Sequence, residues 1–131
     1  MSTHAVVWID HKEARVFRYT PAELEQSTVA APLHHLHNKH PRGPEGLKSH
    51  PEDAKHFFRD VVSALGDSTE ILIVGPSTAK LELIRFVHDH AHALKSRIVG
   101  VETVDHPTDR QLIAYAKTYF HRVDAIRAVM S

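Results

Sequence analysis

A polar segment at residues 33–48 gathers basic and imidazole side chains of the kinds that bind anions or metals. It reads LHHLHNKHPRGPEGLK, and prolines and glycines separate its charged residues. Lys and Arg on such a backbone bind phosphates in a way that depends on salt and carries no base specificity. A segment of more than about 12–15 residues without an apolar pattern is often functional in a small domain. We therefore predict RNA or phosphate binding here, with a solvated loop that binds nothing as the alternative. The predicted binding residues are Lys39, His40, Arg42, Gly43 and Lys48.

A second candidate anion site is the sequence GPST at residues 75–78, where a predicted strand leads into a predicted helix. The first turn of a helix leaves backbone N–H groups free for an anion. Lys80 in that turn opposes the helix dipole, and a bound phosphate would reverse this cost. We predict phosphate binding by Ser77, Thr78 and Lys80. The alternative is that Ser77 or Thr78 serves only as a helix N-cap.

The chain contains 13 histidines and no cysteine, so a metal site would have to use imidazole and carboxylate ligands. His88 and His92 stand four residues apart in a predicted helix, a spacing that lets two imidazoles reach one ion. No acid completes an H-E-x-x-H pattern, and His88 borders the apolar stripe of that helix. We therefore expect no resident metal or cofactor. The candidate ligands, should one bind, are His34, His35, His37, His88 and His92.

Composition narrows the classes of function. The 16 Lys and Arg residues balance 16 Asp and Glu residues, so any attraction to nucleic acid must come from a local patch. No apolar segment approaches the roughly 18 residues of a membrane span, and the N-terminus lacks a secretion signal. No serine or threonine stands in a nucleophile motif such as Gly-x-Ser-x-Gly. With 131 residues, we expect one cytoplasmic domain over residues 1–131 that makes no membrane contact.

Hydrophobic periodicity and cap residues predict the order βββαβαβα. Strands are predicted at residues 5–9, 14–19, 24–31, 70–74 and 97–104, with a hairpin turn at 10–13. Helices are predicted from a capping box at residues 49–52 to Gly66, at 77–94, and from a second capping box at Thr108 to Phe120. The crossover at residues 70–104 makes its two strands parallel. This order predicts a ribonuclease H-like α/β fold with a mixed five-stranded sheet, in which the apolar strands 5–9 and 70–74 lie side by side at the centre.

A fold of this kind raises the alternative of a metal-dependent hydrolase or nuclease. Two-metal phosphodiester cleavage needs three or four converging carboxylates. The strand at residues 70–74 ends in Gly75 and offers no acid, and Asp10 is equally suited to a turn. The sequence therefore favours a binding role over this one. The acids that a nuclease would use are Asp10, Glu52 or Asp53, and Asp105 or Asp109.

Two segments resemble a known family. KHPRGPEG at residues 39–46 and IVGPSTAK at 73–80 are similar to the central domain of class-1 eukaryotic and archaeal peptide-chain release factors and of Pelota. Those domains share the βββαβαβα order, a loop with a basic-glycine run, and a Gly-Pro turn after the fourth strand. The resemblance covers residues 6–120 and implies a stand-alone, non-catalytic protein that contacts the ribosome or tRNA through its basic, histidine-rich loop.

One departure from the family limits what the resemblance implies. Release factors carry a Gly-Gly-Gln tripeptide in this loop, where it positions water for ester hydrolysis. The matching place here reads Gly43-Pro44-Glu45-Gly46, with a proline and no glutamine. Pelota also lacks the tripeptide and acts by binding. Hydrolysis of peptidyl-tRNA is therefore not expected.

Overall fold

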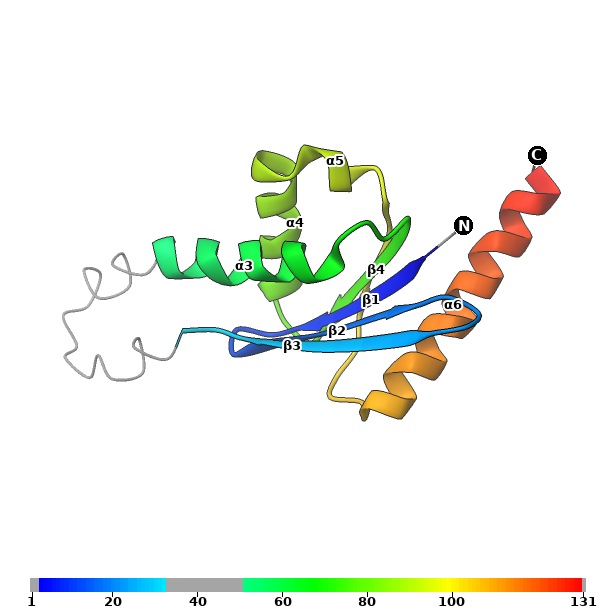
Figure 1. Cartoon of the computed structure of the whole chain (residues 1–131), viewed down its shortest axis with the longest axis horizontal. Helices are drawn as coiled ribbons and strands as arrows, with labels where there is room; N and C mark the ends of the chain where they lie inside the picture. The colour runs from blue at the N-terminus through cyan, green and yellow to red at the C-terminus, as the bar shows by residue number, and fades with distance from the viewer. Residues whose placement is uncertain (1–2, 33–50, 131) are drawn as a thin grey trace.

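The computed structural model describes residues 3–32 and 51–130 of the chain. They form a five-stranded sheet with helices on both faces (Figure 1). The strands are β1 (His4–Ile9), β2 (Glu13–Tyr19), β3 (Leu24–Ala30), β4 (Glu70–Gly75) and β5 (Ile98–Thr103). The helices are α3 (Pro51–Leu65), α4 (Ala79–His90), α5 (His92–Lys95) and α6 (Asp109–Met130).

The order of strands in the sheet is β3-β2-β1-β4-β5. Strands β1, β2 and β3 form an antiparallel meander, and β4 and β5 continue the sheet parallel to β1. The predicted mixed sheet is thus confirmed, as is the central position of residues 5–9 beside 70–74. Residues 5–9 and 71–74 are all apolar because both strands are covered on both of their faces.

The side chains of β1 point alternately to the two faces of the sheet and contribute to two separate parts of the core. Ala5, Val7 and Ile9 point to the face covered by α3 and α4, whereas Val6 and Trp8 point to the face covered by α6. Figure 1 shows α3, α4 and α5 on one side of the sheet and α6 on the other. These five residues are 0% or 1% exposed. Burial of each large apolar side chain contributes about 1.5–3 kcal/mol, so the two-sided cover of β1 stabilises the fold strongly.

Two predicted local signals are confirmed by their hydrogen bonds. Asp10 closes the β1–β2 turn, since its Oδ1 accepts from the N–H groups of Lys12 and Glu13 at 2.8 and 2.9 Å. At the start of α6, the N–H of Thr108 donates to Oε1 of Gln111 at 2.9 Å, and the N–H of Gln111 donates to Oγ1 of Thr108 at 3.1 Å. This reciprocal pair is the predicted capping box.

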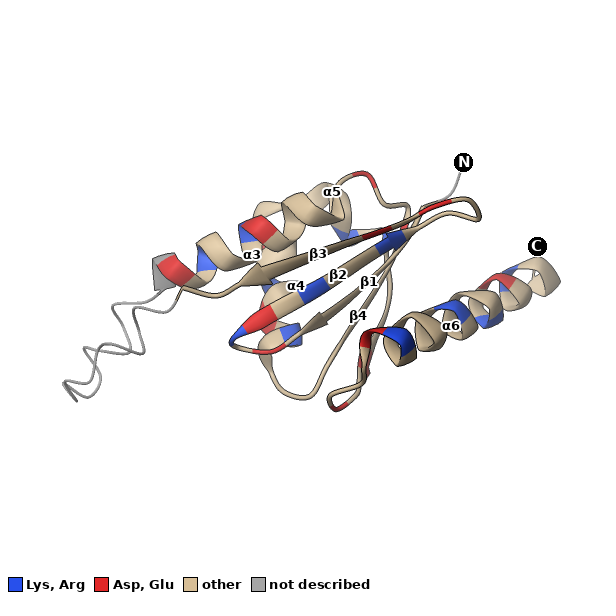
Figure 2. Ribbon diagram, turned by 60° about the horizontal axis from the view of Figure 1, so that its bottom comes forward, with Lys and Arg blue, Asp and Glu red and all other residues tan. Residues whose placement is uncertain are grey.

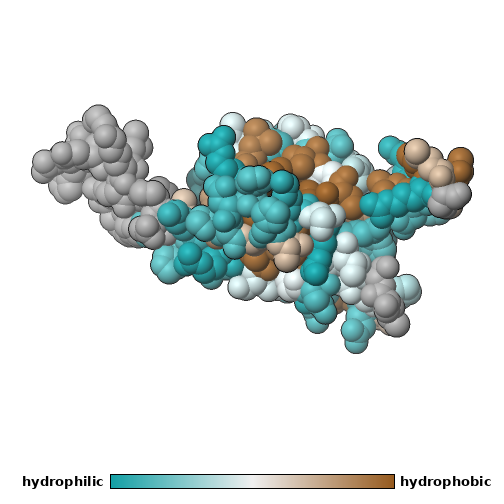
Figure 3. Space-filling model, turned by 90° about the horizontal axis from the view of Figure 1, so that it is seen from above, coloured by the Kyte–Doolittle hydropathy of each residue, from teal (hydrophilic) through white to brown (hydrophobic). Residues whose placement is uncertain are grey.

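Two predicted helices are corrected. The helix expected at residues 77–94 is divided into α4 and α5 at Ala91, whose φ of −138° and ψ of 55° are not helical. The break still lets Leu94 reach the core, where it is 6% exposed, so tertiary packing overrides the continuous local pattern. Helix α6 runs ten residues beyond the predicted end at Phe120, because no Gly or Pro follows in residues 121–130. Figure 3 shows hydrophobic groups at the free end of α6, where Val129 and Met130 are 85% and 80% exposed.

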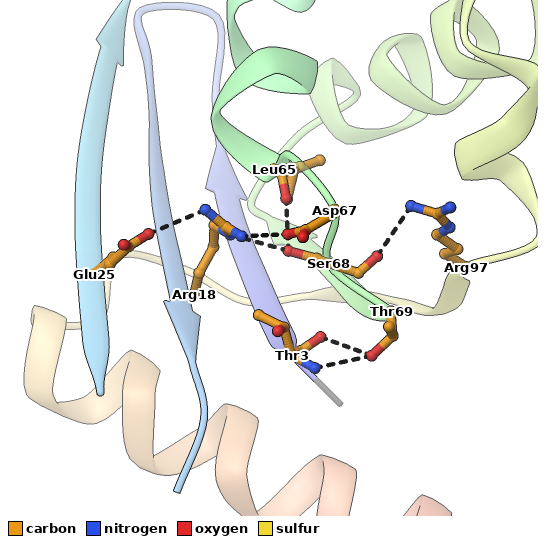
Figure 4. Close-up of polar contacts among 8 residues, drawn as sticks. All are labelled: Thr3, Arg18, Glu25, Leu65, Asp67, Ser68, Thr69 and Arg97. Atoms are coloured by element: carbon orange, nitrogen blue, oxygen red, sulfur yellow. Dashed lines mark hydrogen bonds and ion pairs between the residues drawn. The ribbon is translucent and has the colours of Figure 1, made fainter. Parts of the chain in front are cut away.

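A polar network around the buried Ser68 fixes the turn between α3 and β4 (Figure 4). Helix α3 ends before Gly66, whose φ of 56° is readily adopted only by glycine. The fully buried Ser68 donates from Oγ to the carbonyl of Leu65 at 2.6 Å and accepts from Nε of Arg18 at 3.3 Å. Arg18 also pairs with Asp67 at 2.6 Å. One arginine on β2 therefore holds this turn against the amino-terminal end of the central strands.

We expect Gly75→Ala to lower the free energy of unfolding by about 1–3 kcal/mol. A Cβ at this position would lie 2.2 Å from the carbonyl oxygen of Ile9, so β4 would have to move away from β1. Urea unfolding followed by circular dichroism measures the change. Ser77→Ala, two residues later in the turn, is the control and should change stability by less than about 0.5 kcal/mol. Equal stability of the glycine and alanine proteins would contradict the close approach.

We also expect Tyr19 to make stability depend on alkaline pH. Burial, and then the carboxylates of Asp124 and Glu70, raise the pKa of Tyr19 from 10.0 to about 12. The folded state therefore holds this proton more tightly than the unfolded state, so the contribution is complete below pH 10 and is lost as the pH rises from 10 to 12. Because Tyr19 is only half-buried, we expect a loss of roughly 1–2 kcal/mol after allowance for solvent screening.

Urea unfolding of the wild type and Tyr19→Phe at pH 9 and pH 11 tests this expectation. The phenylalanine variant should lose less stability between the two pH values than the wild type. Tyr115→Phe is the control, since Tyr115 is 39% exposed and should contribute less. Parallel losses in the wild type and Tyr19→Phe would show that Tyr19 titrates alike in both states.

Candidate functional site at the carboxyl ends of the strands

Strands β1, β4 and β5 are parallel, so their carboxyl ends meet at one edge of the sheet, where ligands commonly bind in α/β proteins. Strand β3 ends at the same edge, and the N–H of Ala31 donates to the carbonyl of Lys12 at 2.8 Å. Helix α3 also begins there (Figure 1). The two described residues that flank the polar segment, Pro32 and Pro51, therefore lie at this edge. The predicted binding residues Lys39, His40, Arg42, Gly43 and Lys48 lie outside the described residues.

A cavity of about 200 Å³ lies beside Pro32 and the first turns of α3. Its wall is mainly apolar, and Nε2 of His11 lies 3.0 Å from Oε2 of Glu82 among its lining residues. This volume is below the roughly 300–1,000 Å³ of typical small-molecule sites, so the cavity suits a single side chain or a base edge better than a whole substrate. The lining residues are His11, Ala31, Pro32, Asp53, Ala54, Phe57, Phe58, Ala79 and Glu82.

The turn at residues 75–78 leads from β4 into α4 at the same edge. Thr78 occupies the N-cap position, and its carbonyl accepts from the N–H groups of Leu81 and Glu82 at 2.9 and 3.0 Å. The side chain of Thr78 makes no capping hydrogen bond, and its Oγ1 lies 3.3 Å from Oε2 of Glu82. The turn therefore keeps its first N–H groups free of a side-chain cap, as an anion site requires.

Lys80 and Glu82 set the electrostatics of this turn. Lys80 is 7% exposed, and its Nζ donates to the carbonyl of Ser77 at 2.6 Å. Glu82 places a carboxylate in the first turn of α4, where it interacts favourably with the helix dipole. A phosphate approaching Ser77, Thr78 and Lys80 would meet this carboxylate. The structure brings the three predicted residues together, but the carboxylate of Glu82 already interacts with the positive end of the helix dipole.

On the α6 face, the same edge carries an interaction that local patterns did not predict. Nε1 of Trp8 donates to the carbonyl of Asp105 at 2.6 Å, and the guanidinium of Arg15 lies 4.6 Å from the Trp8 ring centre. Arg15 also pairs with Asp109 at 2.6 Å. Trp8 and Arg15 are cross-strand partners in the β1–β2 hairpin. A register predicted for this hairpin could therefore have identified the pair. These interactions hold the turn between β5 and α6 against the sheet.

The acids of the nuclease alternative do not converge in the described parts of the chain. Asp10 serves the hairpin turn, Asp109 pairs with Arg15, and Asp105 pairs with Nδ1 of His106 at 2.8 Å. Within residues 3–32 and 51–130, the potential ligands that gather within 4.8 Å are His4, Glu70 and Asp124. They lie at the opposite end of the strands. Asp10, Asp105 and Asp109 therefore do not form the converging set of carboxylates that two-metal cleavage needs.

Two of the histidines predicted as metal ligands, His88 and His92, lie among the described residues. His88 and His92 are exposed, their ring centres are 5.9 Å apart, and the helix break at Ala91 separates them. Nδ1 of His88 lies 3.2 Å from a carboxylate oxygen of Asp89. No third ligand joins the pair among the residues the structure describes. The remaining candidates, which lie outside those residues, are His34, His35 and His37.

No protein-family model and no curated protein matches this chain. Solved structures do match its fold. The Pelota protein of Thermoplasma acidophilum is 21% identical, with a TM-score of 0.57 over 86% of this chain and 30% of its own. Archaeoglobus fulgidus Pelota is 17% identical, with a TM-score of 0.61 over 88% of this chain and 31% of its own. An archaeal translation termination factor is 14% identical, with a TM-score of 0.60 over 98% of this chain and 40% of its own.

These comparisons confirm, as a likeness of fold, the resemblance predicted from residues 39–46 and 73–80. This chain spans 30% to 40% of the length of the three matched proteins. Among the described residues, no helix combines the length and apolar character needed to cross a membrane.

The turn at residues 75–78 yields a test of anion binding. We expect inorganic phosphate to shift the backbone amide resonances of residues 77–81 more in Glu82→Gln than in the wild type, because the substitution removes the carboxylate that competes for the end of the helix dipole. Two-dimensional ¹H–¹⁵N NMR spectra during a phosphate titration measure these shifts. Glu23→Gln, which makes the same charge change in the turn between β2 and β3, is the control. Equal responses of all three proteins would remove this turn from the binding site.

Proposed function

We propose that this chain is a non-catalytic, translation-associated binding protein that contacts the ribosome or tRNA. The observation that carries this proposal is the match of its fold to two Pelota proteins and a translation termination factor, over 86% to 98% of this chain. We place its site of action in the cytoplasm, where these partners are found.

Charge and position support the basic segment as the RNA-binding part of the chain. Lys39, Arg42 and Lys48 lie within ten residues of one another in the sequence, with His40 and Gly43 between them. The segment follows Pro32, on the edge that also holds the turn at residues 75–78. Phosphate binding by both segments would then fall on one side of the protein. Because the chain as a whole has no net charge, this local patch supplies the attraction to RNA.

Two observations support binding without hydrolysis. The sequence Gly43-Pro44-Glu45-Gly46 has neither the glutamine nor the flexible glycine pair of a release factor. At the carboxyl-end edge, Asp10, Asp105 and Asp109 are each engaged in a turn or an ion pair and do not gather around an ion site. The metal-dependent hydrolase is therefore the less favoured function.

Replacing Lys39, Arg42 and Lys48 together with Ala should weaken association with ribosomes and leave the melting temperature nearly unchanged. Removal of each cation that binds a phosphate should lower the slope of log affinity against log salt by about 0.7–0.9, whereas exposed charges add little to folding stability. Cosedimentation with ribosomes over a range of salt concentrations measures affinity and slope, and thermal unfolding measures stability.

The matched control replaces Arg59, Arg85 and Lys95 with Ala, which removes the same charge from exposed positions on α3, α4 and α5. The control should bind nearly as the wild type does. Equal weakening in both triple variants would show that only total charge matters. Absence of wild-type association with ribosomes or tRNA at low salt would refute the proposed function itself.

A further inference from the structure

Three potential metal ligands meet at the amino-terminal ends of β1 and β4, at the end of the strands opposite to the candidate functional site. They are His4, Glu70 and Asp124, each of which brings one ligand atom within 4.8 Å of the others. His4 and Glu70 are the first residues of β1 and β4 and are partners in the parallel register. Asp124 comes from the part of α6 beyond Phe120. Three elements distant in sequence therefore converge at one point.

The three ligand atoms lie close together. Nε2 of His4 is 2.8 Å from Oε1 of Glu70 and 3.8 Å from Oδ2 of Asp124. The first distance is that of an ion pair, although the two atoms are not aligned as a hydrogen bond in the described part of the chain. A cation bound by all three groups would take the place of this pairing.

Neighbouring side chains hold the first two ligands in place. The imidazole of His4 stacks on Tyr19, with ring centres 5.4 Å apart, and packs against Phe120 at 4.5 Å. Oε2 of Glu70 pairs with Nη1 of Arg127 and leaves Oε1 facing His4. Such orienting interactions are characteristic of metal ligands, whose affinity depends on the groups that fix them.

The charges around the cluster favour a bound cation. Glu70 and Asp124 contribute two negative charges, and Arg127 on α6 offsets one of them. The ammonium of Lys117 lies 5.7 Å from the centre of the Tyr19 ring. The two carboxylates and the single guanidinium leave a net negative charge beside His4.

We propose that His4, Glu70 and Asp124 bind one divalent transition-metal ion of the zinc type. An imidazole nitrogen with two carboxylates suits Zn²⁺ or Co²⁺, whereas Mg²⁺ and Ca²⁺ prefer sets made of oxygen alone. The ion would join the last turns of α6 to the first residues of β1 and β4. This site is separate from the proposed RNA-binding segment and does not depend on it.

Titration of the metal-free full chain with Zn²⁺ and Co²⁺ tests the proposal. We expect Asp124→Asn and Glu70→Gln to bind one equivalent fewer than the wild type, or to bind it at least about tenfold more weakly. The visible absorption of Co²⁺ in a site with nitrogen and carboxylate ligands should weaken in the same variants. The double variant His88→Ala with His92→Ala is the control, because it removes two exposed imidazoles elsewhere and should keep this equivalent.

Hydrogen exchange provides an independent measurement, because protection of α6 does not depend on ions that bind at other histidines. Zn²⁺ should slow amide exchange in residues 121–130 of the wild type and of the control, but not of Asp124→Asn, and Mg²⁺ should have no such effect. Asp124 is exposed on α6, so its substitution should leave the fold intact. If Asp124→Asn binds Zn²⁺ as the wild type does, or if Zn²⁺ leaves exchange unchanged, the cluster is an ion-pair network and the proposal is wrong.

Discussion

Strand β1 has to be covered on both faces, and the positions of the other elements follow from that requirement. Five consecutive residues from Ala5 to Ile9 are buried, so helices must pack on both sides of the sheet. The meander supplies β2 on one side of β1, and β4 pairs with β1 on the other. The last residue of β4, Gly75, lies so close to β1 that only a residue without a side chain fits against the carbonyl of Ile9.

The apolar middle of the sheet confines polar chemistry to the two ends of its central strands. Buried charged groups are costly unless they are paired, so ionisable side chains gather where the strands emerge. The carboxyl ends hold the hairpin turn of Asp10, the Trp8–Arg15 pair and the turn before α4. The amino-terminal ends hold His4 and Glu70. Figure 2 shows basic residues along α6 and acidic residues at its start and in its later turns. These later turns add Asp124 and Arg127 to this second end.

The electrostatics of the carboxyl-end edge shape what it can bind. Nζ of Lys80 donates to the carbonyl of Ser77, and Arg15 is engaged by Asp109. These two cations of the described edge are thus committed to structural interactions. Under the proposed function, the attraction to RNA would therefore come mainly from the basic residues of segment 33–48.

The sequence alone determined the elements that depend on near neighbours. Periodicity located all five strands, paired 5–9 with 70–74 at the centre of the sheet, and identified the turn at Asp10 and the capping box at Thr108. It also supported the likeness of fold to release factors and Pelota. Turns and caps depend on residues one to four positions apart, and a buried strand is a continuous run of apolar residues. Both patterns can be recognised in the sequence.

Only the tertiary structure decided where the helix breaks at Ala91, how far α6 extends, and which side chains converge. Trp8, Arg15 and Asp109 meet because of strand register and the crossing of α6. His4, Glu70 and Asp124 meet across more than a hundred residues for the same reason. Local spacing pointed to His88 and His92 and not to His4, since a ligand set is defined by distance in space. No local pattern encodes that distance.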